Sequence, residues 1–525
     1  MQANPFAHKT PLFDLLAHSA TTSGDSPCID FGQYHYSYRA IYSLAVSFAR
    51  LIESTVKPAP GPKTTVAIYL PNSDLFVAAF FGLSALGVTI VPVNPMLKSD
   101  EIAHILSDSQ ASVLILSEDL YKQVTLSANQ SLCTIVVAKE QDEPLPDPAS
   151  GLALVEFTRG QLDSKLPVVC YGQQSYVDES PCLIVYTSGT TGKPKGAVLS
   201  HKNVQFTINA YPHILQLTGQ DRLLAILPFC HLYGLLVVLV GAIKDGAALS
   251  VLAHFEPHKA LQAISQERVT VLPAVPTMYH FMLLAMQEHH YDLSSLRLAV
   301  TGGAPMPDGL MLRVQEALPV PVLEGYALTE TTVIATLNPK DKCKLGSVGL
   351  PFSGLQIGVR DNLQNLWLGP GPEQVGEICI KGACIMQGYL NNPFATSEAI
   401  KDGWLYTGDL GYVDSEGYVF INGRSKELIV RGGMNVYPRE VEEVLLHLES
   451  VLEAAVVGVP DANMGERVKA CIVLKQGKQL NEGQVQAHCR AHLADYKLPR
   501  TIVFMSALPK KLYRQSFEEA FVIYQ

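Results

Sequence analysis

The sequence predicts an α/β fold: a large N-terminal part with parallel-rich sheets and a β-rich subdomain, followed by a small C-terminal α+β domain. Three observations support this prediction. Short runs rich in β-branched residues recur from residue 65 to residue 300, with helix-patterned segments between several of them. From about residue 348, glycine-rich turns separate shorter strands, and a compact set of helices and strands follows residue 423. Alternation of strands and helices is typical of parallel sheets covered by helices.

Each expected element follows from its residue pattern. Strands are expected where β-branched residues cluster, at 65–70, 89–93, 111–116, 134–138, 182–186, 247–252, 269–275 and 296–300. Helical patterning covers 99–109 and 257–267, and the β-rich subdomain has strands at 375–382 and 416–423. The last part contains helices at 438–448 and 481–494 and strands at 452–459 and 469–475. We therefore predict an N-terminal domain of residues 1–422 and a C-terminal domain of residues 423–525.

Composition and charge exclude several classes of protein. Apolar residues make up 48% of the chain and charged residues 17%, which excludes a disordered chain. The formal net charge of −10 gives no basic footprint for nucleic acid, so no nucleic-acid partner is expected. The 10 cysteines form no CxxC pair, which argues against a zinc knuckle or a disulfide scaffold. No secretory signal is visible at the N-terminus, and we expect a cytoplasmic protein.

Two uncharged stretches, 75–93 and 223–243, are long enough to resemble membrane spans. In the first, Gly87 is followed by a β-branched run and Pro92, which indicates helix, turn and strand. In the second, Pro228, His231 and Gly234 break the run, which favours a strand followed by a buried helix. We therefore expect no transmembrane span.

The loop that follows the expected strand 182–186 is the strongest functional signal. Three glycines and four hydroxyl residues are concentrated between residues 186 and 196, and lysines supply the only charges. Glycine permits close backbone approach, while hydroxyls, backbone N–H groups and lysine can bind phosphate oxygens. The loop is not a Walker A motif, because Pro194 follows Lys193 where that motif has serine or threonine. The candidate phosphate-binding residues are Thr187, Ser188, Gly189, Thr190, Thr191, Gly192, Lys193 and Lys195.

Seven ordered segments, of which this loop (YTSGTTGKPKG) is the first, resemble motifs of one family. The others are LPFCHLYG at 227–234, TGGAP at 301–305, EGYALTE at 324–330, YTGD at 406–409, GRSKE at 423–427 and RGGMNVYPRE at 431–440. In this order they resemble the adenylate-forming superfamily, which includes acyl-CoA synthetases, peptide-synthetase adenylation domains and firefly luciferase. The last segment is most similar to fatty-acid and aryl-acid CoA ligases.

The resemblance implies an enzyme that activates a carboxylic acid with ATP to acyl-AMP and then transfers the acyl group to coenzyme A. Two anions must approach each other in the first step, so positive charge and Mg²⁺ are needed. Two alternatives stay open at this point. The acceptor thiol could belong to an acyl carrier protein, or the chain could be a ligase-like nucleotide-binding protein with impaired adenylation.

The resemblance also assigns roles to single residues. Glu330 matches a magnesium-binding glutamate, and Thr329 matches a residue that contacts the α-phosphate. Gly325, Tyr326 and Ala327 match the adenine shelf, with Ala327 in place of the commoner glycine, and Glu324 before them is expected among the nucleotide-binding residues. Asp409 matches the carboxylate that accepts the ribose hydroxyls, and Arg424 matches a ribose or phosphate contact. Lys426 matches the hinge, and Gly432 and Gly433 match the coenzyme A channel.

The acid pocket is expected at His231 and at the small residues Gly302, Gly303 and Ala304. A lone histidine in an apolar run is usually a core residue, whereas the resemblance implies a position beside the acyl carboxylate; both interpretations remain. An α-amino-acid substrate would require a carboxylate near this segment, and residues 229–240 contain none. This favours an apolar acid, of the fatty-acid class.

The C-terminal end departs from the family pattern LPKTxxGKxxRxxL, whose second lysine is catalytic. Ungapped alignment with the segment 508–517 (LPKKLYRQSF) puts Gln515 at that lysine. If four loop residues are missing instead, Lys511 takes the role, and we favour this register because the residues after it then match as well. The predicted catalytic residues are therefore Lys511, His231, Glu330 and Thr187.

Overall fold

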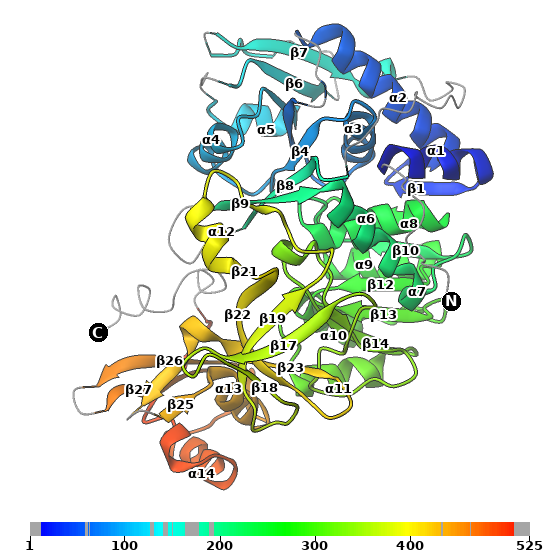
Figure 1. Ribbon diagram of the computed structural model, residues 1–525. Coiled ribbons are helices and arrows are strands. Elements are labelled where there is room, and N and C mark those ends of the chain that lie inside the picture. The colour runs from blue at the N-terminus through cyan, green and yellow to red at the C-terminus, as the bar shows by residue number, and fades with distance from the viewer. Residues whose placement is uncertain are drawn as a thin grey trace, which may run out of the picture.

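The computed structural model of the 525-residue chain describes residues 12–57, 61, 63–126, 131–139, 145–149, 151–162, 178–187, 194–431, 434–461 and 464–508. Within these residues the strands form four sheets, two of them parallel-rich and covered by helices (Figure 1). The predicted α/β class is confirmed.

The eight-stranded sheet carries the phosphate-loop hairpin at one edge. In the spatial order given below, the strands from β8 to β7 run parallel to one another. Strand β9 is antiparallel to β8, and β20 is antiparallel to β9. Its spatial order is β20 (Gly388–Tyr389), β9 (Lys195–Ser200), β8 (Pro181–Thr187), β4 (Thr89–Pro92), β3 (Thr65–Tyr69), β5 (Val113–Ser117), β6 (Thr134–Lys139) and β7 (Ala153–Thr158).

The nine-stranded sheet carries the predicted adenine-shelf motif on β14. Its central strands are parallel, and antiparallel strands close both edges. Its spatial order is β16 (Leu350–Pro351), β15 (Thr336–Leu337), β14 (Val322–Tyr326), β13 (Leu298–Thr301), β12 (Val271–Ala274), β10 (Arg222–Ala225), β11 (Ala248–Val251), β1 (Pro27–Phe31) and β2 (Tyr34–Ser37).

Alternate residues of each parallel strand face different cores, as a period of two requires. On β3, Val66 and Ile68 join the large core between the two sheets, whereas Ala67 and Tyr69 join the core on the outer face. The large core also takes residues of α1 (Leu12–Thr22), α2 (Tyr38–Thr55), α3 (Asp74–Ala85), α6 (His201–Ala210) and α8 (Gly241–Asp245). The short helix α7 (Pro212–Leu215) follows α6. The outer faces are covered by α4 (Ser99–Asp108) and α5 (Glu118–Gln123), and by α9 (Pro257–Glu267), α10 (Pro276–Glu288) and α11 (Asp308–Ala317).

Both uncharged stretches lie in the large core. The first forms α3 and β4, as predicted, and the second begins with β10 and ends in α8. Between β10 and α8 lies a π-helical segment, Tyr233–Val240, which is apolar on all sides and almost wholly buried. Among the described residues, no helix combines the length and the apolar character that crossing a membrane requires.

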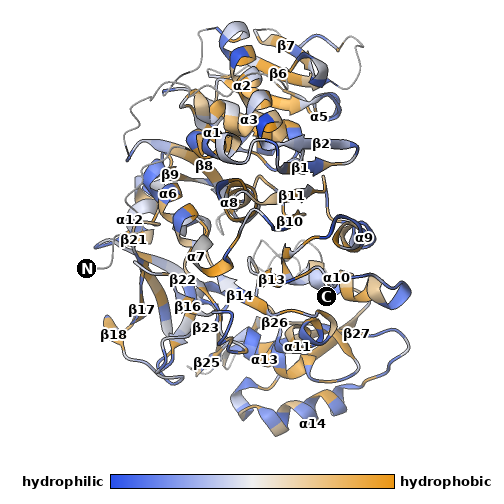
Figure 2. Cartoon of the chain, turned by 90° about the vertical axis from the view of Figure 1, so that its right-hand side faces the viewer, coloured by the Kyte–Doolittle hydropathy of each residue, from blue (hydrophilic) through white to orange (hydrophobic). Residues whose placement is uncertain are grey.

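The β-rich part is an antiparallel six-stranded sheet of β17 (Gln356–Asp361), β18 (Leu366–Leu368), β19 (Gly376–Lys381), β21 (Ile400–Lys401), β22 (Trp404–Val413) and β23 (Val419–Arg424), with α12 (Pro393–Ala399) beside it. Hydropathy colouring shows both hydrophilic and hydrophobic residues along its strands (Figure 2).

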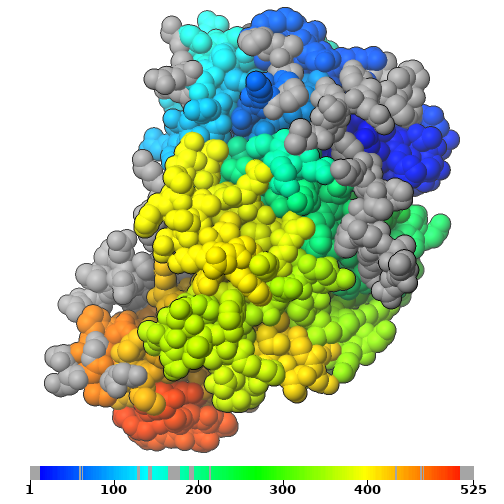
Figure 3. Space-filling view, in the orientation of Figure 1, coloured from blue at the N-terminus to red at the C-terminus, as the bar shows by residue number. Residues whose placement is uncertain are grey.

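The last sheet contains β24 (Ile429–Arg431), β25 (Met434–Val436), β26 (Val451–Asp461), β27 (Gly465–Leu474) and β28 (Thr501–Met505), packed on α13 (Pro438–Leu446) and α14 (Glu482–His492). Its elements match the predicted ones within a few residues. In the space-filling view it lies at the lower end of the molecule, in orange and red, against the yellow-green β-rich part (Figure 3). The predicted domain boundary at 422/423 falls at the end of β23, and it stays a prediction.

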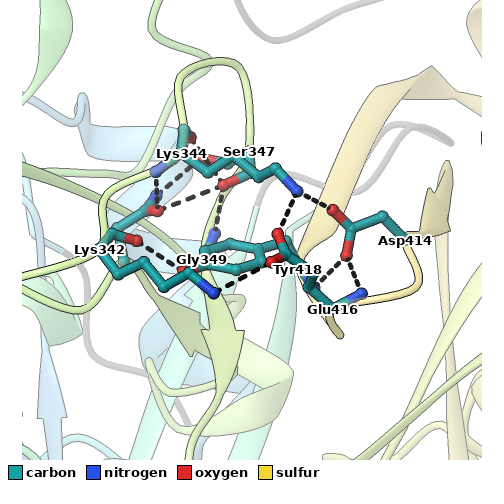
Figure 4. Close-up of polar contacts among 8 residues, drawn as sticks. Lys342, Lys344, Ser347, Gly349, Asp414, Glu416 and Tyr418 are labelled. Carbon is teal, nitrogen blue, oxygen red and sulfur yellow. Dashed lines mark hydrogen bonds and ion pairs between the residues drawn. The ribbon is translucent and has the colours of Figure 1, made fainter.

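An ionic cluster joins the nine-stranded sheet to the six-stranded one (Figure 4). Lys344, in the loop between β15 and β16, pairs with Asp414 and with Glu416 in the turn between β22 and β23. Its ammonium lies 5.0 Å from the centre of the Tyr418 ring, whose hydroxyl donates to the Lys342 carbonyl at 2.6 Å. The cluster therefore supports β15, the antiparallel neighbour of the adenine-shelf strand β14.

Candidate active site

Three polar side chains meet where β14, β22 and β23 come together. The Tyr326 hydroxyl donates to Asp409 Oδ2 at 2.5 Å, and Arg424 Nε lies 3.0 Å from Asp409 Oδ1. Asp409 and Arg424 are cross-strand partners in the β22–β23 register, so the sheet itself brings the ion pair together. We call these three residues the nucleoside end of the site, after the role that the sequence resemblance predicts for them.

Asp409 is a buried carboxylate, with only 3% of its surface exposed. Burial raises its pKa, and the charge of Glu330 adds to the rise, while Arg424 and the Tyr326 hydroxyl oppose it. A buried carboxylate that is held ionised by two donors can accept further hydrogen bonds from a ligand hydroxyl. The backbone before it is fixed as well, because Gly408 has φ +73° and its N–H donates to Glu377 Oε1 at 2.7 Å.

A second group, the phosphate end, lies between β9, β20 and the turn after β14. Lys195 Nζ is 5.1 Å from the centre of the Tyr389 ring, and the Tyr389 hydroxyl donates to Glu330 Oε1 at 2.7 Å. Thr187 and Lys195 are paired across β8 and β9, so the phosphate loop is the connection of a hairpin with fixed ends. The predicted residues Ser188, Gly189, Thr190, Thr191, Gly192 and Lys193 lie outside the described residues.

Helix α4 braces this hairpin. His104 Nε2 lies 3.1 Å from the Pro194 carbonyl oxygen, and the Tyr186 hydroxyl donates to Asp108 Oδ2 at 2.8 Å. Gly196 has no room for a side chain, because a Cβ atom there would lie 2.8 Å from Ile184 and 3.1 Å from the Tyr186 ring. The ends of the phosphate loop are thus positioned from outside the loop.

Glu330 sits in a strained turn. Thr329–Thr331 forms a single 3₁₀ turn after β14, and the next two residues, Thr332 and Val333, have φ values of +51° and +61°. A β-branched residue in this region costs on the order of 1–3 kcal/mol and persists only where the surroundings hold it. Here Thr207 donates to the Thr332 carbonyl at 2.9 Å, Tyr211 donates to the Val333 carbonyl at 2.5 Å, and Met386 N–H donates to the Glu330 carbonyl at 2.9 Å.

The expected acid pocket adjoins the adenine shelf. A Cβ atom on Gly302 would lie 3.1 Å from the Gly325 carbonyl oxygen and 3.9 Å from the Tyr233 ring. Gly303 has φ +79° and faces Val275, and Ala304 is half-buried. His231 is half-buried two residues before Tyr233, and its N–H donates to the Pro228 carbonyl at 3.0 Å. Position 302 thus requires glycine, because the backbone of β14 approaches it closely.

Glu324 lies behind the shelf, against the C-terminal part of the chain. Burial raises its pKa to about 7, with Asp308 and Glu443 adding to the rise, whereas the Arg439 charge and the Met306 N–H lower it. The Met306 N–H donates to Glu324 Oε1 at 3.2 Å. Arg439, on α13, also donates to the Ile421 carbonyl at 2.8 Å, so this arginine connects α13 to the β-rich sheet.

The structure brings together most of the predicted site residues that it describes. Lys426 is exposed in a 3₁₀ turn at 425–427, between β23 and β24, where a hinge was predicted. Gly432, Gly433, Lys511 and Gln515 lie outside the described residues. The sequence interpretation missed Tyr389, Tyr233 and Arg439. Tyr233 and Arg439 lie within the segments 227–234 and 431–440, where no role was assigned to them, and Tyr389 lies in none of the seven segments.

Comparison with known proteins places these motifs in one family. The profile described as "AMP-binding enzyme" matches residues 16–390, and "AMP-binding enzyme C-terminal domain" matches residues 440–512. A long-chain-fatty-acid–CoA ligase of Bacillus subtilis (strain 168) is 31% identical over 528 aligned residues, covering 96% of this chain and 93% of the relative.

Solved structures agree. The anthranilate CoA ligase AuaEII, in complex with anthranoyl-AMP, superposes with a TM-score of 0.84 at 27% identity, covering 96% of this chain and 94% of that one. ATP-bound MatB from Rhodopseudomonas palustris also gives a TM-score of 0.84, at 26% identity and 98% coverage of both chains. The chain belongs to the AMP-binding enzyme family, the adenylate-forming superfamily, and is an AMP-forming acid–CoA ligase.

Proposed function

We propose that this ligase activates an apolar carboxylic acid of the fatty-acid class with ATP and passes the acyl group to coenzyme A. The observation that carries the proposal is the convergence of a nucleoside end and a phosphate end around β14. Acyl-CoA synthetase activity follows from the family, whereas the class of acid, the metal ion and the roles of single residues are proposals.

At the nucleoside end, we propose that Asp409 accepts both ribose hydroxyls and that Tyr326, beside Gly325, stacks on the adenine. Arg424 keeps the buried carboxylate ionised and contacts the ribose or the phosphates. Stacking on an aromatic face and hydrogen bonds to a charged acceptor are both effective in a site shielded from water. The ATP-bound relative supports nucleotide binding by this fold.

At the phosphate end, Thr187, Lys195 and the loop between them bind the phosphates, and Thr329 contacts the α-phosphate. The donor set fits Mg²⁺, which prefers carboxylate oxygens. Tyr389 holds Glu330 Oε1, and Oε2 accepts no hydrogen bond from the residues that the structure describes. Glu330 would hold the ion, which neutralises phosphate charge as the carboxylate approaches.

The acid enters beside Gly302, Gly303 and Ala304, with His231 near its carboxylate. An apolar acid suits this pocket, because Tyr233 and Val275 are the side chains that approach the two glycines. The fatty-acid ligase of Bacillus subtilis and the anthranilate ligase support an apolar acid, alkyl or aryl.

In the second half-reaction, we propose that residues 423–525 act as a mobile domain turning about Lys426. Gly432 and Gly433 would line the channel for the pantetheine arm of coenzyme A. A few backbone torsions at an exposed turn are enough for such a rearrangement. The comparisons do not favour a carrier-protein acceptor or a turnover-impaired chain.

The substrate is tested by AMP release from a panel of saturated fatty, aryl and α-amino acids, with coenzyme A and Mg²⁺ present. We expect fatty acids to give the largest kcat/KM and amino acids to give no release above background. A preference for an amino acid would overturn the proposed pocket.

The catalytic lysine is tested by ATP–pyrophosphate exchange. A preorganised charge-stabilising donor is worth about 10²–10³ in rate, so Lys511→Ala should slow exchange by about that factor. Lys510→Ala is the matched control and should retain exchange. If Lys511→Ala exchanges normally and Gln515→Lys accelerates exchange, the ungapped register is correct instead.

A further inference from the structure

A group of metal-ligating side chains lies on the outer face of the nine-stranded sheet, where α9 and α10 pack side by side (Figure 2). His258 is in the first turn of α9, Glu288 is the last residue of α10, and His289 follows directly. None of the three belongs to the proposed nucleotide or acid site.

Their ligand atoms are close enough to share one ion. His258 Nε2 lies 3.3 Å from Glu288 Oε2, and the ligand atoms of all three residues lie within 4.8 Å of one another. Nitrogen and oxygen ligands at about 2.0–2.2 Å around a tetrahedral Zn²⁺ are about 3.4 Å apart. His258 Nε2 and Glu288 Oε2 already have about this separation. His289 has to move only slightly, and its exposed side chain is able to do so.

His258 is held in the orientation that a metal ligand needs. Its other nitrogen, Nδ1, lies 2.7 Å from the Tyr291 hydroxyl, which leaves Nε2 directed at Glu288. Metal-binding histidines typically have their second nitrogen fixed by such a partner. The backbone at His258 is also fixed, because Glu256 caps α9 and accepts from the His258 and Lys259 N–H groups at 3.1 and 2.8 Å.

We propose that His258, Glu288 and His289 form a binding site for a divalent transition metal of the Zn²⁺ class. Two imidazoles and one carboxylate match the His₂Glu donor set of zinc, with a water molecule in the fourth position. Mg²⁺ and Ca²⁺ prefer oxygen ligands, so the site is chemically distinct from the proposed magnesium site at Glu330.

Such an ion would tie the C-terminal end of α10 to the first turn of α9. The opposite end of α10 begins at Pro276, next to Val275, which faces Gly303 of the acid pocket. A ligand that binds only the folded chain stabilises it by mass action. Bound metal should therefore raise the unfolding temperature, without being required for pyrophosphate exchange.

The test is calorimetric titration of ZnCl₂ into the full chain, stripped with chelator and kept in excess MgCl₂ without ATP. The wild type should bind one equivalent that is absent from His258→Ala and His289→Ala. Tyr291→Phe should weaken binding about 10–100-fold, as the loss of an orienting partner does. His290→Ala is the matched control, one residue along the chain, and should bind as the wild type does.

Thermal unfolding provides a second readout, in which ZnCl₂ raises the melting temperature of the wild type and His290→Ala but not of His258→Ala or His289→Ala. Equal binding by the wild type and both variants would place the zinc elsewhere, for instance at the exposed Cys133 and Cys343, and would overturn the proposal. No binding by the wild type would mean that His258 and Glu288 form an ion pair only.

Discussion

The nucleoside end and the phosphate end of the site are built in different ways. The nucleoside end is a network of Tyr326, Asp409 and Arg424, in which the register of two strands pairs the charges and the carboxylate is buried, although the arginine is 54% exposed. At the phosphate end, Lys195 on β9, Tyr389 on β20 and Glu330 in a strained turn are all partly exposed. The difference teaches that the register of paired strands can fix a buried carboxylate, whereas a turn held by side chains from other elements leaves its carboxylate partly exposed.

The largest effect should come from the nucleoside end. Asp409→Asn leaves Arg424 beside an amide and removes a charged acceptor from two proposed ribose hydrogen bonds. Hydrogen bonds to charged groups contribute about 1.5–3 kcal/mol each, so ATP affinity should fall by about 100-fold or more. Titration calorimetry with ATP measures this. Asp402→Asn, at an exposed turn before β22, is the control and should bind ATP normally. A mild effect of Asp409→Asn would mean that the network serves the fold and not the nucleotide.

Substitutions at the phosphate end should lower activity by weakening the proposed binding of Mg²⁺. Glu330→Gln removes the charge that would hold Mg²⁺, and AMP release should fall by about 100-fold, the scale of one electrostatic donor or acceptor at a reacting centre. Tyr389→Phe removes only the hydrogen bond that orients Glu330, so it should cost about tenfold and raise the Mg²⁺ concentration needed for half-maximal rate. Tyr412→Phe is the control, since Tyr412 stacks on Phe420 away from Glu330. Equal losses in both Tyr389→Phe and Tyr412→Phe would argue against an orienting role.

The two ends also differ in how far the sequence alone predicted them. The parallel strands were predictable because a local alternation sets them: the expected strand 65–70 is β3, with Val66 and Tyr69 in different cores. Asp409 and Arg424 followed from motif resemblance, and local pattern would have left them in an ordinary turn. Tyr389 was missed because its contact with Glu330 depends on β20 pairing with β9, far away in the sequence.

The π-helical segment Tyr233–Val240 was likewise beyond local prediction. Its residues are apolar on every side, so periodicity predicted a buried helix without its type. Because π-helices are rare in proteins, a local pattern predicts the ordinary α-helical turn instead.

A smaller, pH-dependent effect should arise behind the nucleoside end. Burial raises the pKa of Glu324 to about 7, above its ordinary value of 4.5, so the folded state binds more protons than the unfolded state between these values. Binding of this proton makes its full contribution to the free energy of unfolding below pH 4.5, and that contribution is lost as the pH rises through 7. Glu324→Gln should therefore be more stable than the wild type at pH 8 by about 1–3 kcal/mol, and the gap should close towards pH 4.5.

Urea unfolding at several pH values measures that gap. Glu316→Gln, at an exposed glutamate of α11, should follow the wild type at every pH. A constant difference between Glu324→Gln and the wild type across this range would show that Glu324 does not titrate with the shifted pKa. The folded chain would then accommodate the negative charge of Glu324 in its buried position.

The smallest effect should come from the ionic cluster that supports the nucleoside end from a distance. Lys344 is 38% exposed, and its partner Glu416 is 47% exposed, so solvent screens their attraction. Lys344→Gln should lower the unfolding temperature slightly at low salt, and the difference should shrink near 1 M NaCl without vanishing, because the second partner, Asp414, is only 14% exposed. ATP affinity should not change, because β15 remains paired with β14 through backbone hydrogen bonds. If Lys344→Gln weakened ATP binding as strongly as Asp409→Asn, the rigidity of the nucleoside end would depend on surface charge, and its contrast with the phosphate end would fail.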